Sequence, residues 1–339
     1  MDHLKLLSES DLNSLVVTRK DEIKFGEHIQ LVPYHTSIYD SFLNLDVQYI
    51  IFGICEDVGV FANGGKQGTS NAWHTVLKSL LNVQSNGFLK AKNIAILGYL
   101  DYTELQLKVA SFDAANPSDV SRARKKVSRI DEDVSFLVSQ IVKAGKTPIV
   151  IGGGHNNAYG CIKGTSLALN SPINAVNFDA HTDFRPEEGR HSGNGFSYAY
   201  AEGFLKNYFV FGLHENYTSH AIIKTMNKLK NVQFNTYEAV RVRKESSFNK
   251  ELKRAFDHVS GTFYGIEIDL DAIRHINTSA KTPSGYSTDK ARTFLSFMAK
   301  NTNAKYLHIC EGIPEDDNDT LLGKLVSFLI TDFIKAHGG

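Results

Sequence analysis

Three side chains that can bind a metal ion follow an apolar run of the sequence. Residues 173–178 have the length and composition of a buried strand in a parallel sheet. Asp179, His181 and Asp183 follow at every second position, and side chains of an extended chain alternate between faces, so all three can point the same way. Crowding two carboxylates and an imidazole is unfavourable unless a cation gathers them. The alternative is a polar loop whose charges lie in water, but ligand type and spacing favour a metal site.

More candidates follow three other strand-like runs: His155, Asp269, Asp271 and Glu311. Each has an ordinary reading, because a lone histidine is usually structural and a pair of aspartates can end a strand near solvent. The carboxyl ends of parallel strands, however, lie at one edge of a sheet, where ligands of such folds bind. The sequence therefore predicts one shared site. Glu267 lies deeper in its strand, so it is expected to pair with a neighbour rather than bind metal.

The predicted site contains four carboxylates and two imidazoles. This ligand set suits a pair of hard-to-borderline divalent ions, and manganese is the natural candidate. One ion with six strong ligands would have no open position, whereas two ions sharing carboxylates leave room for a water. Two such ions lower the pKa of a water and supply hydroxide near neutral pH. Glu311 is not needed as a ligand and could receive the cationic end of a substrate.

A polar, glycine-containing loop over residues 184–196 follows the 179–183 motif. It could be a plain surface connection. It also lies where a substrate-recognition loop would be expected, and four of its side chains could hold carboxylates: Arg185, Arg190, Ser192 and Asn194. An earlier glycine-rich loop at 63–69 contains a lysine, but it lacks the spacing of a P-loop and reads as a turn bordering a cleft.

Strand-like and helix-like segments alternate along the chain. Strands are predicted at 47–54, 93–99, 147–151, 173–178, 208–213, 232–234, 262–271 and 304–310. Helices are predicted at 71–81, 118–144, from 219, at 249–258 and at 321–336. Because no repeat or linker interrupts this alternation, the sequence favours a single α/β domain with a mainly parallel sheet over residues 47–339. Residues 1–46 form an extension of unknown role.

Composition excludes several classes of protein. The chain of 339 residues is 42% hydrophobic and 22% charged, which is enough for a packed core. Lysine plus arginine and aspartate plus glutamate both number 37, so the net charge gives no reason to expect nucleic acid or a membrane as a partner. Its cysteines, Cys55, Cys161 and Cys310, are too few and too far apart for a disulfide framework. The N-terminus lacks a signal-peptide pattern, and a cytoplasmic protein is expected.

The candidate residues resemble those of the ureohydrolases, a family that includes arginase, agmatinase and formimidoylglutamase. Three motifs carry the resemblance, in order: Gly152-Gly153-Gly154-His155, Asp179-Ala180-His181-Thr182-Asp183 and Asp269-Leu270-Asp271. The resemblance extends from about Gly53 to Glu311. It implies a three-layer α/β/α sandwich around an eight-stranded parallel sheet, and two Mn²⁺ per chain.

The resemblance also implies roles for the site residues. One manganese would be held by His155, Asp179, Asp183 and Asp269, and the other by Asp179, His181, Asp269 and Asp271. Asp183 would pass a proton from the attacking water to the leaving amine. Glu311 matches the family's glutamate that binds the guanidinium or amidine group. Family members are often trimers or hexamers, so a homo-oligomer is possible.

Two departures from arginases point to one branch of the family. Phe196 stands where arginases have a histidine, and the string from His191 to Phe196 is more similar to the His-Ser-Gly-Thr-Pro-Phe of formimidoylglutamases. After Asp271 the chain reads Arg274-His275 where arginases have Asp-Pro. The resemblance therefore favours hydrolysis of N-formimidoyl-L-glutamate to glutamate and formamide, a step of histidine breakdown. Ser192 and Asn194, helped by Arg185 or Arg190, would hold the carboxylates of the substrate.

Three alternatives remain open. The first is an arginase, or another ureohydrolase that acts on a guanidino acid and releases urea. The second is a zinc deacetylase, which has this type of sheet but uses fewer ligands, so His155 and Asp183 argue against it. The third is a non-catalytic relative that binds a metabolite or a partner. Loss of ligands would mark such a protein, and none is lost here.

Overall fold

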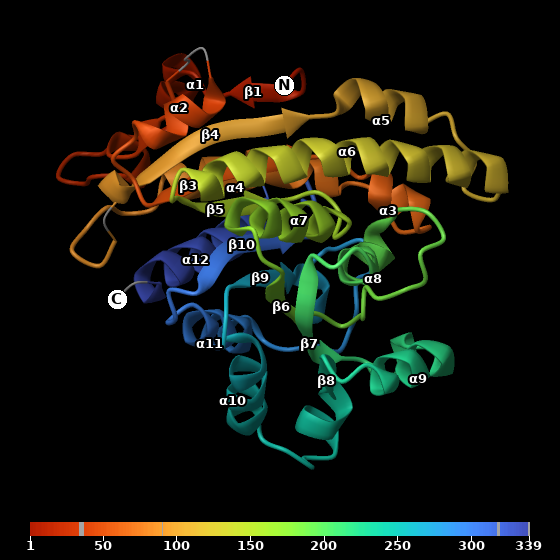
Figure 1. Cartoon of the computed structure of the whole chain (residues 1–339). Coiled ribbons are helices and arrows are strands. Elements are labelled where there is room, and N and C mark those ends of the chain that lie inside the picture. The colour runs from red at the N-terminus through yellow and green to blue at the C-terminus, as the bar shows by residue number, and fades with distance from the viewer. Residues whose placement is uncertain (34–36, 90, 317–318, 338–339) are drawn as a thin grey trace.

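A single mixed sheet forms the centre of the computed structural model, which describes residues 1–33, 37–89, 91–316 and 319–337 (Figure 1). Within these residues the sheet has ten strands in the order β1-β4-β3-β5-β10-β9-β6-β7-β8, and β2 also pairs with β4. The strands are β1 (Leu4–Leu6), β2 (Gln30–Leu31), β3 (Tyr49–Cys55), β4 (Ile94–Asp101), β5 (Thr147–Ile151), β6 (Ile173–Phe178), β7 (Leu205–Leu213), β8 (Val232–Thr236), β9 (Tyr264–Asp269) and β10 (Ala304–Cys310). Strands β3 to β10 run parallel to their neighbours, and β1 runs antiparallel to β4.

Helices cover both faces of the sheet. They are α1 (Glu9–Leu15), α2 (Ile38–Leu43), α3 (Val58–Ala62), α4 (Ala72–Leu81), α5 (Thr103–Val109), α6 (Pro117–Lys143), α7 (Asn157–Leu169), α8 (Gly195–Ala201), α9 (His220–Lys228), α10 (Phe248–Val259), α11 (Thr288–Met298) and α12 (Thr320–Ala336). Helices α4, α10, α11 and α12 pack on one face, while α6, α7 and α8 pack on the other. Among the described helices, none is long and apolar enough to cross a membrane.

Two hydrophobic cores, one on each face, follow from the alternation of strand side chains. In β5, Ile149 and Ile151 belong to the core beneath α4 and α12, whereas Val150 belongs to the core beneath α6 and α7. The strand is buried on both faces, which explains why its sequence is continuously apolar. The predicted α/β/α sandwich with a mainly parallel sheet is confirmed.

The expected number of eight strands is wrong. The eight strands β3 to β10 form a continuous parallel array, but β2, which is also parallel to β4, and the antiparallel β1 extend the sheet along the outer edge of β4. Both come from the first 46 residues, and at three and two residues they are too short to show any periodicity. Helix α11 is also absent from the predictions, although Ala291, Phe294, Leu295 and Met298 are buried at helical spacing.

The first 46 residues share both sheet and core with the rest of the chain. Leu4 and Leu6 of β1 pair with Leu100 and Gly98 of β4. Leu12 and Phe25 are buried in the core beneath α4. The described part of this segment therefore packs as part of the sandwich.

The four central strands place the predicted site residues. Strands β5, β10, β9 and β6 are neighbours in this order, and all run in the same direction. Their carboxyl ends lead into His155, Glu311, Asp269 and Asp179 respectively. Parallel pairing alone therefore brings together residues that are up to 156 positions apart in the sequence.

Close packing of α4 on β3 gives a test of this architecture. A Cβ atom at Gly53 would overlap the indole ring of Trp73, which is fully buried. We expect Gly53→Ala to lower the free energy of unfolding by about 1–3 kcal/mol, because overpacked cores must shift. Denaturant unfolding measures the change. Gly87→Ala is the matched control, since its Cβ would meet nothing within 4 Å, and an equal loss in both variants would contradict the predicted contact.

Candidate metal centre

Four buried side chains converge at the first candidate metal position. Nδ1 of His155 lies 2.8 Å from Oδ2 of Asp183, 3.1 Å from Oδ2 of Asp269 and 3.3 Å from Oδ2 of Asp179. Although these atoms are close, neither ring nitrogen of His155 makes a hydrogen bond. The ligand atoms thus face a common point instead of aligning with one another, as the donors of a cation site do.

A second position lies beside the first. Nδ1 of His181 lies 2.8 Å from Oδ2 of Asp271 and 3.6 Å from Oδ1 of Asp179. Asp179 therefore faces both positions, one through each carboxylate oxygen. Oδ1 of Asp271 is buried without a hydrogen-bond partner. The side chain of His181 is 30% exposed, so this position is the one closer to solvent.

The backbone reaches this arrangement in a way that the sequence does not reveal. Strand β6 ends at Phe178, and Asp183 has a left-handed φ of +43°. Asp179 and Asp183 face His155, whereas His181 faces Asp271 and the other oxygen of Asp179, so the three side chains converge without the expected alternation of an extended strand. Asp179 is instead oriented by a local turn in which its Oδ1 accepts the N–H of His181 at 2.6 Å.

Electrostatics favour a cation in this centre. Burial and the charge of Asp179 raise the pKa of Asp183 to about 6. Burial, together with the charges of Asp271 and Asp179, raises the pKa of Asp269 well above its usual range. Like charges repel strongly when they are buried, and a divalent ion would remove this penalty. The oxygen and imidazole donors therefore fit two divalent ions of the Mn²⁺ class. Asp269 lies at the first position, and its sharing between two ions stays a prediction.

The buried carboxylate of Glu267 lies close to both His155 and His308. Oε1 of Glu267 accepts the hydroxyl of Tyr306 at 2.6 Å, and its Oε2 lies 2.6 Å from Nδ1 of His308 and 3.5 Å from Nε2 of His155. Burial opposes ionisation of Glu267, but His308 and His155 outweigh it and lower its pKa to about 2. The prediction that Glu267 pairs with a neighbour is confirmed, and carboxylates in this place orient metal-binding histidines.

Glu311 lies next to the metal centre with one free oxygen. Its Oε1 accepts the backbone N–H of His155 at 2.6 Å, while its Oε2 is buried and has no partner. Burial raises its pKa to about 8. An unpaired buried acceptor is costly unless a ligand supplies a donor. Glu311 can therefore accept an N–H group, and its role in binding the cationic end of a substrate stays a prediction.

Glu56 organises the turn that carries His155, and the sequence analysis assigned it no role. This fully buried carboxylate accepts N–H groups from Val58 at 2.8 Å, from Gly154 at 3.2 Å, and from the side chains of Asn156 and Asn157 at 3.0 and 2.6 Å. It joins the end of β3 to the turn after β5. Its signal in the sequence was an acidic residue just after a strand, the same signal that marked Asp179.

Two of the predicted substrate-binding residues use their side chains for hydrogen bonds within the protein. Arg190 is buried and directs its donors to Asp131 at 2.8 Å, to the carbonyl of Asn156 at 2.8 Å and to Oδ1 of Asn194 at 2.6 Å. Asn194 also donates to the carbonyl of Gly189 at 2.9 Å. The predicted contact of Arg190 and Asn194 with substrate carboxylates is therefore not supported. The pair holds the recognition loop in shape.

The other two predicted residues meet at Asn63. Nδ2 of Asn63 donates to Oγ of Ser192 at 3.1 Å, and Nη1 of Arg185 donates to Oδ1 of Asn63 at 2.7 Å. Arg185 also pairs with Glu188 at 2.9 Å, and its side chain is 43% exposed. Arg185 and Ser192 can thus reach a ligand, and their role stays a prediction.

Phe196 contacts a metal-ligand candidate and not the solvent. It is fully buried, meets the ring of His155 edge-on at 5.3 Å, and stacks on Tyr208 at 4.4 Å. Its position near the recognition loop is therefore explained by packing around His155.

Aromatic stacking fixes the more exposed ligand, His181. Its ring stacks on Tyr217 at 5.3 Å, Tyr217 stacks on His214 at 5.2 Å, and His214 stacks on Tyr237 at 4.8 Å. The hydroxyl of Tyr217 lies 2.9 Å from Oγ1 of Thr282. This row of rings limits the motion of His181, and no pattern in the sequence marked it.

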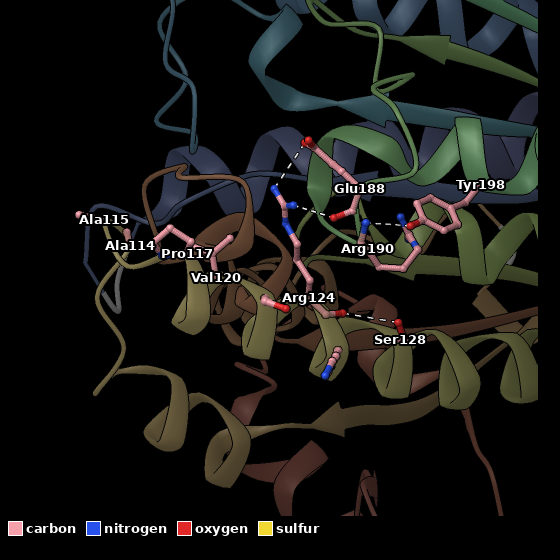
Figure 2. Close-up of a pocket in the computed structure, with 12 residues that line it drawn as sticks. Ala114, Ala115, Pro117, Val120, Arg124, Ser128, Glu188, Arg190 and Tyr198 are labelled. Carbon is pink, nitrogen blue, oxygen red and sulfur yellow. Dashed lines mark hydrogen bonds and ion pairs between the residues drawn. The ribbon is translucent and has the colours of Figure 1, made fainter.

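A cavity of about 520 Å³ lies outside the recognition loop, between α6 and residues 188–190 (Figure 2). Arg124 crosses it and donates to the carbonyl of Glu188 at 2.7 Å. None of the candidate metal ligands lines this cavity. It is therefore separate from the metal centre.

Known proteins resemble this chain in sequence and in fold. A model of the arginase family matches residues 47–333. Formimidoylglutamase of Chromobacterium violaceum is 27% identical over 80% of this chain and 82% of its own. That of Streptococcus pyogenes is 23% identical over 83% of this chain and 82% of its own. The formiminoglutamase of Trypanosoma cruzi with Mn²⁺ has a TM-score of 0.69 at 18% identity, covering 94% of this chain and 100% of its own. The formimidoylglutamase of Bacillus subtilis has a TM-score of 0.70 at 18% identity, covering 94% of this chain and 93% of its own.

Repulsion within the metal centre predicts an unusual effect of one substitution. In wild type, Oδ1 of Asp269 accepts the backbone N–H of Asp271 at 2.8 Å. Asp269→Asn keeps this acceptor oxygen but removes the negative charge. Metal-free Asp269→Asn protein should therefore have a higher Tm than metal-free wild type at neutral pH, while Mn²⁺ should raise Tm less than in wild type.

The sign of the pH dependence follows from the raised pKa of Asp269. Folded wild type holds more protons than the unfolded chain, so its stability falls as pH rises above the ordinary value of 3.8, and the variant lacks this loss. The advantage of the variant should shrink as pH is lowered toward about 4. A lower Tm for the metal-free variant at neutral pH would contradict the repulsion argument.

Proposed function

Because this chain belongs to the arginase family, we propose that it is a formimidoylglutamase that uses two Mn²⁺ ions. It hydrolyses N-formimidoyl-L-glutamate to glutamate and formamide. The observation that carries this proposal is a buried ligand cluster with two positions joined by Asp179, beside the unpaired Oε2 of Glu311. The names of the relatives from Chromobacterium violaceum and Streptococcus pyogenes support the choice of substrate.

The metal ligands divide between the two positions. His155, Asp179, Asp183 and Asp269 would hold one ion, and His181 and Asp271 would hold the other with Asp179 and Asp269. Two bound divalent ions polarise a substrate and lower the pKa of a water to near neutral.

The remaining chemistry belongs to the side chains. Glu311 accepts N–H groups of the formimidoyl end, which fixes the reacting carbon beside the metal centre. The water oxygen bonds to this carbon, and the bond from carbon to the glutamate nitrogen breaks. The carboxylate of Asp183 takes the proton of the water and gives it to the leaving nitrogen.

The recognition loop holds the other end of the substrate. Arg185 is a half-exposed guanidinium, and Asn63 fixes it beside Ser192. A guanidinium and a hydroxyl together suit a carboxylate. In this scheme Arg190 only positions the loop. We also propose a cytoplasmic location, a place in histidine breakdown and a homo-oligomeric assembly, as the family resemblance implies.

Direct measurement of the products tests the proposed function. Manganese-loaded protein is given N-formimidoyl-L-glutamate or L-arginine, and formamide and urea are followed. We expect formamide and no urea. Asp179→Ala should lose both metal ions and turnover, because Asp179 faces both positions. Urea without formamide would replace the proposed substrate with a guanidino acid, and full turnover by Asp179→Ala would refute the metal scheme.

Two arginines of the loop should respond differently to removal. Arg185→Ala should raise KM for N-formimidoyl-L-glutamate about 10- to 100-fold with unchanged Tm, because a charged hydrogen bond contributes about 1.5–3 kcal/mol. Arg190→Ala should destabilise the fold by about 3–5 kcal/mol, because it leaves buried Asp131 unpaired. Steady-state kinetics and thermal unfolding separate the two effects. A raised KM with normal stability in Arg190→Ala would restore Arg190 as a substrate ligand.

A further inference from the structure

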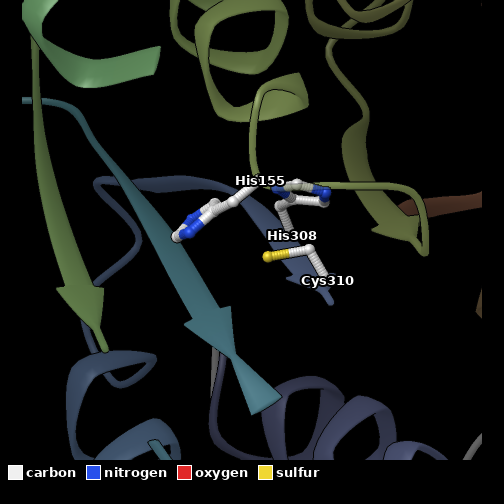
Figure 3. Close-up of side chains that lie close together, drawn as sticks. All are labelled: His155, His308 and Cys310. Atoms are coloured by element: carbon white, nitrogen blue, oxygen red, sulfur yellow. The ribbon is translucent and has the colours of Figure 1, made fainter. Parts of the chain in front are cut away.

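A second group of ligand atoms lies beneath the metal centre. His155, His308 and Cys310 are fully buried, and their side chains lie close together (Figure 3). One ligand atom from each residue lies within 4.8 Å of the others. The two imidazole rings are 6.0 Å apart. His308 and Cys310 are two residues apart on β10, so they project from the same side of the strand.

These ligand atoms make few hydrogen bonds within the protein. Both ring nitrogens of His155 lack hydrogen bonds. The sulfur of Cys310 has one weak contact, at 3.7 Å, with the carbonyl of Ile268. Nε2 of His308 lies 3.4 Å from the carbonyl of Gly152, at the limit of a hydrogen bond.

His308 also has the support that metal-binding histidines usually have. Its Nδ1 lies 2.6 Å from Oε2 of Glu267, which fixes the ring and leaves Nε2 with only the long contact to the carbonyl of Gly152. Glu267 is itself held by the hydroxyl of Tyr306 at 2.6 Å. A ring oriented in this way loses little further freedom when it binds a cation.

We propose that His155, His308 and Cys310 form an additional site, overlapping the first manganese position at His155, for a thiophilic divalent cation of the zinc or cadmium class. Two imidazoles and a thiolate are a typical partial ligand set for such ions, whereas Mn²⁺ prefers oxygen donors. Binding replaces the thiol proton of Cys310 with the cation, and the proton leaves to solvent.

The shared residue makes this site competitive with the first manganese position. His155 lies close to the carboxylates of Asp179, Asp183 and Asp269. It also lies close to the ligand atoms of His308 and Cys310. A thiophilic ion bound to His155 therefore weakens Mn²⁺ at the first position, and Mn²⁺ weakens the thiophilic ion in return. This inference rests on the ligand geometry alone and does not depend on the proposed substrate.

Cadmium titration of the metal-free full-length chain tests the site. We expect the ultraviolet charge-transfer absorption of a cadmium–thiolate bond, saturating at one Cd²⁺ per chain. Cys310→Ser should abolish this absorption. Cys55→Ser should keep it, because Cys55 is an equally buried cysteine outside the cluster. Absence of the absorption in folded wild type, or its persistence in Cys310→Ser, would overturn the proposal.

Two further measurements cover the roles of the histidines. His308→Gln should raise the Kd for Cd²⁺ about 10-fold or more while the far-ultraviolet circular dichroism stays that of wild type. Preloading wild type with Mn²⁺ should raise the apparent Kd for Cd²⁺ by a similar factor through His155. An unchanged Kd in His308→Gln would remove His308 from the site, and an unchanged Kd after preloading would disprove the sharing of His155. Failure to hydrolyse N-formimidoyl-L-glutamate would leave all these readouts unaffected.

Discussion

Mutual repulsion among buried carboxylates is the constraint on which this structure depends. Asp179, Asp183, Asp269 and Asp271 are buried together at the ends of two neighbouring strands. Such a group raises the free energy of the folded chain unless a cation joins it. The rigid parallel sheet is what keeps these side chains from separating. The stability that this sheet supplies is thus partly spent on preparing a site that only a bound ion completes.

Uncharged N–H donors hold several of the carboxylates in and around this site. Glu56 is satisfied by amide N–H groups, and Asp179 and Asp269 each accept the N–H group two residues on. Salt bridges in these places would have lowered the negative charge that attracts a metal ion. The one buried guanidinium of the recognition loop, on Arg190, is neutralised by Asp131 away from the ligands.

The sequence predicted those parts of the site that parallel strands dictate. Strand ends and ligand types sufficed for His155, Asp179 and Asp269, because parallel pairing brings such ends to one edge. The sequence did not predict roles that depend on contacts between residues far apart in the chain. The sequence around Arg190 does not indicate that this residue pairs with Asp131, which lies 59 residues earlier. The row of rings at Tyr217 likewise depends on how loops meet in space.

The short strand β1 has a consequence for association between chains. Strand β4 lies at one side of the parallel array, and its outer backbone groups would be free to pair with a strand of another molecule. Leu4–Leu6 and Gln30–Leu31 occupy that edge instead. Both segments lie outside residues 47–333, the part that the family model matches. Protection against edge-to-edge aggregation is therefore supplied by a part of the chain that takes no part in the chemistry.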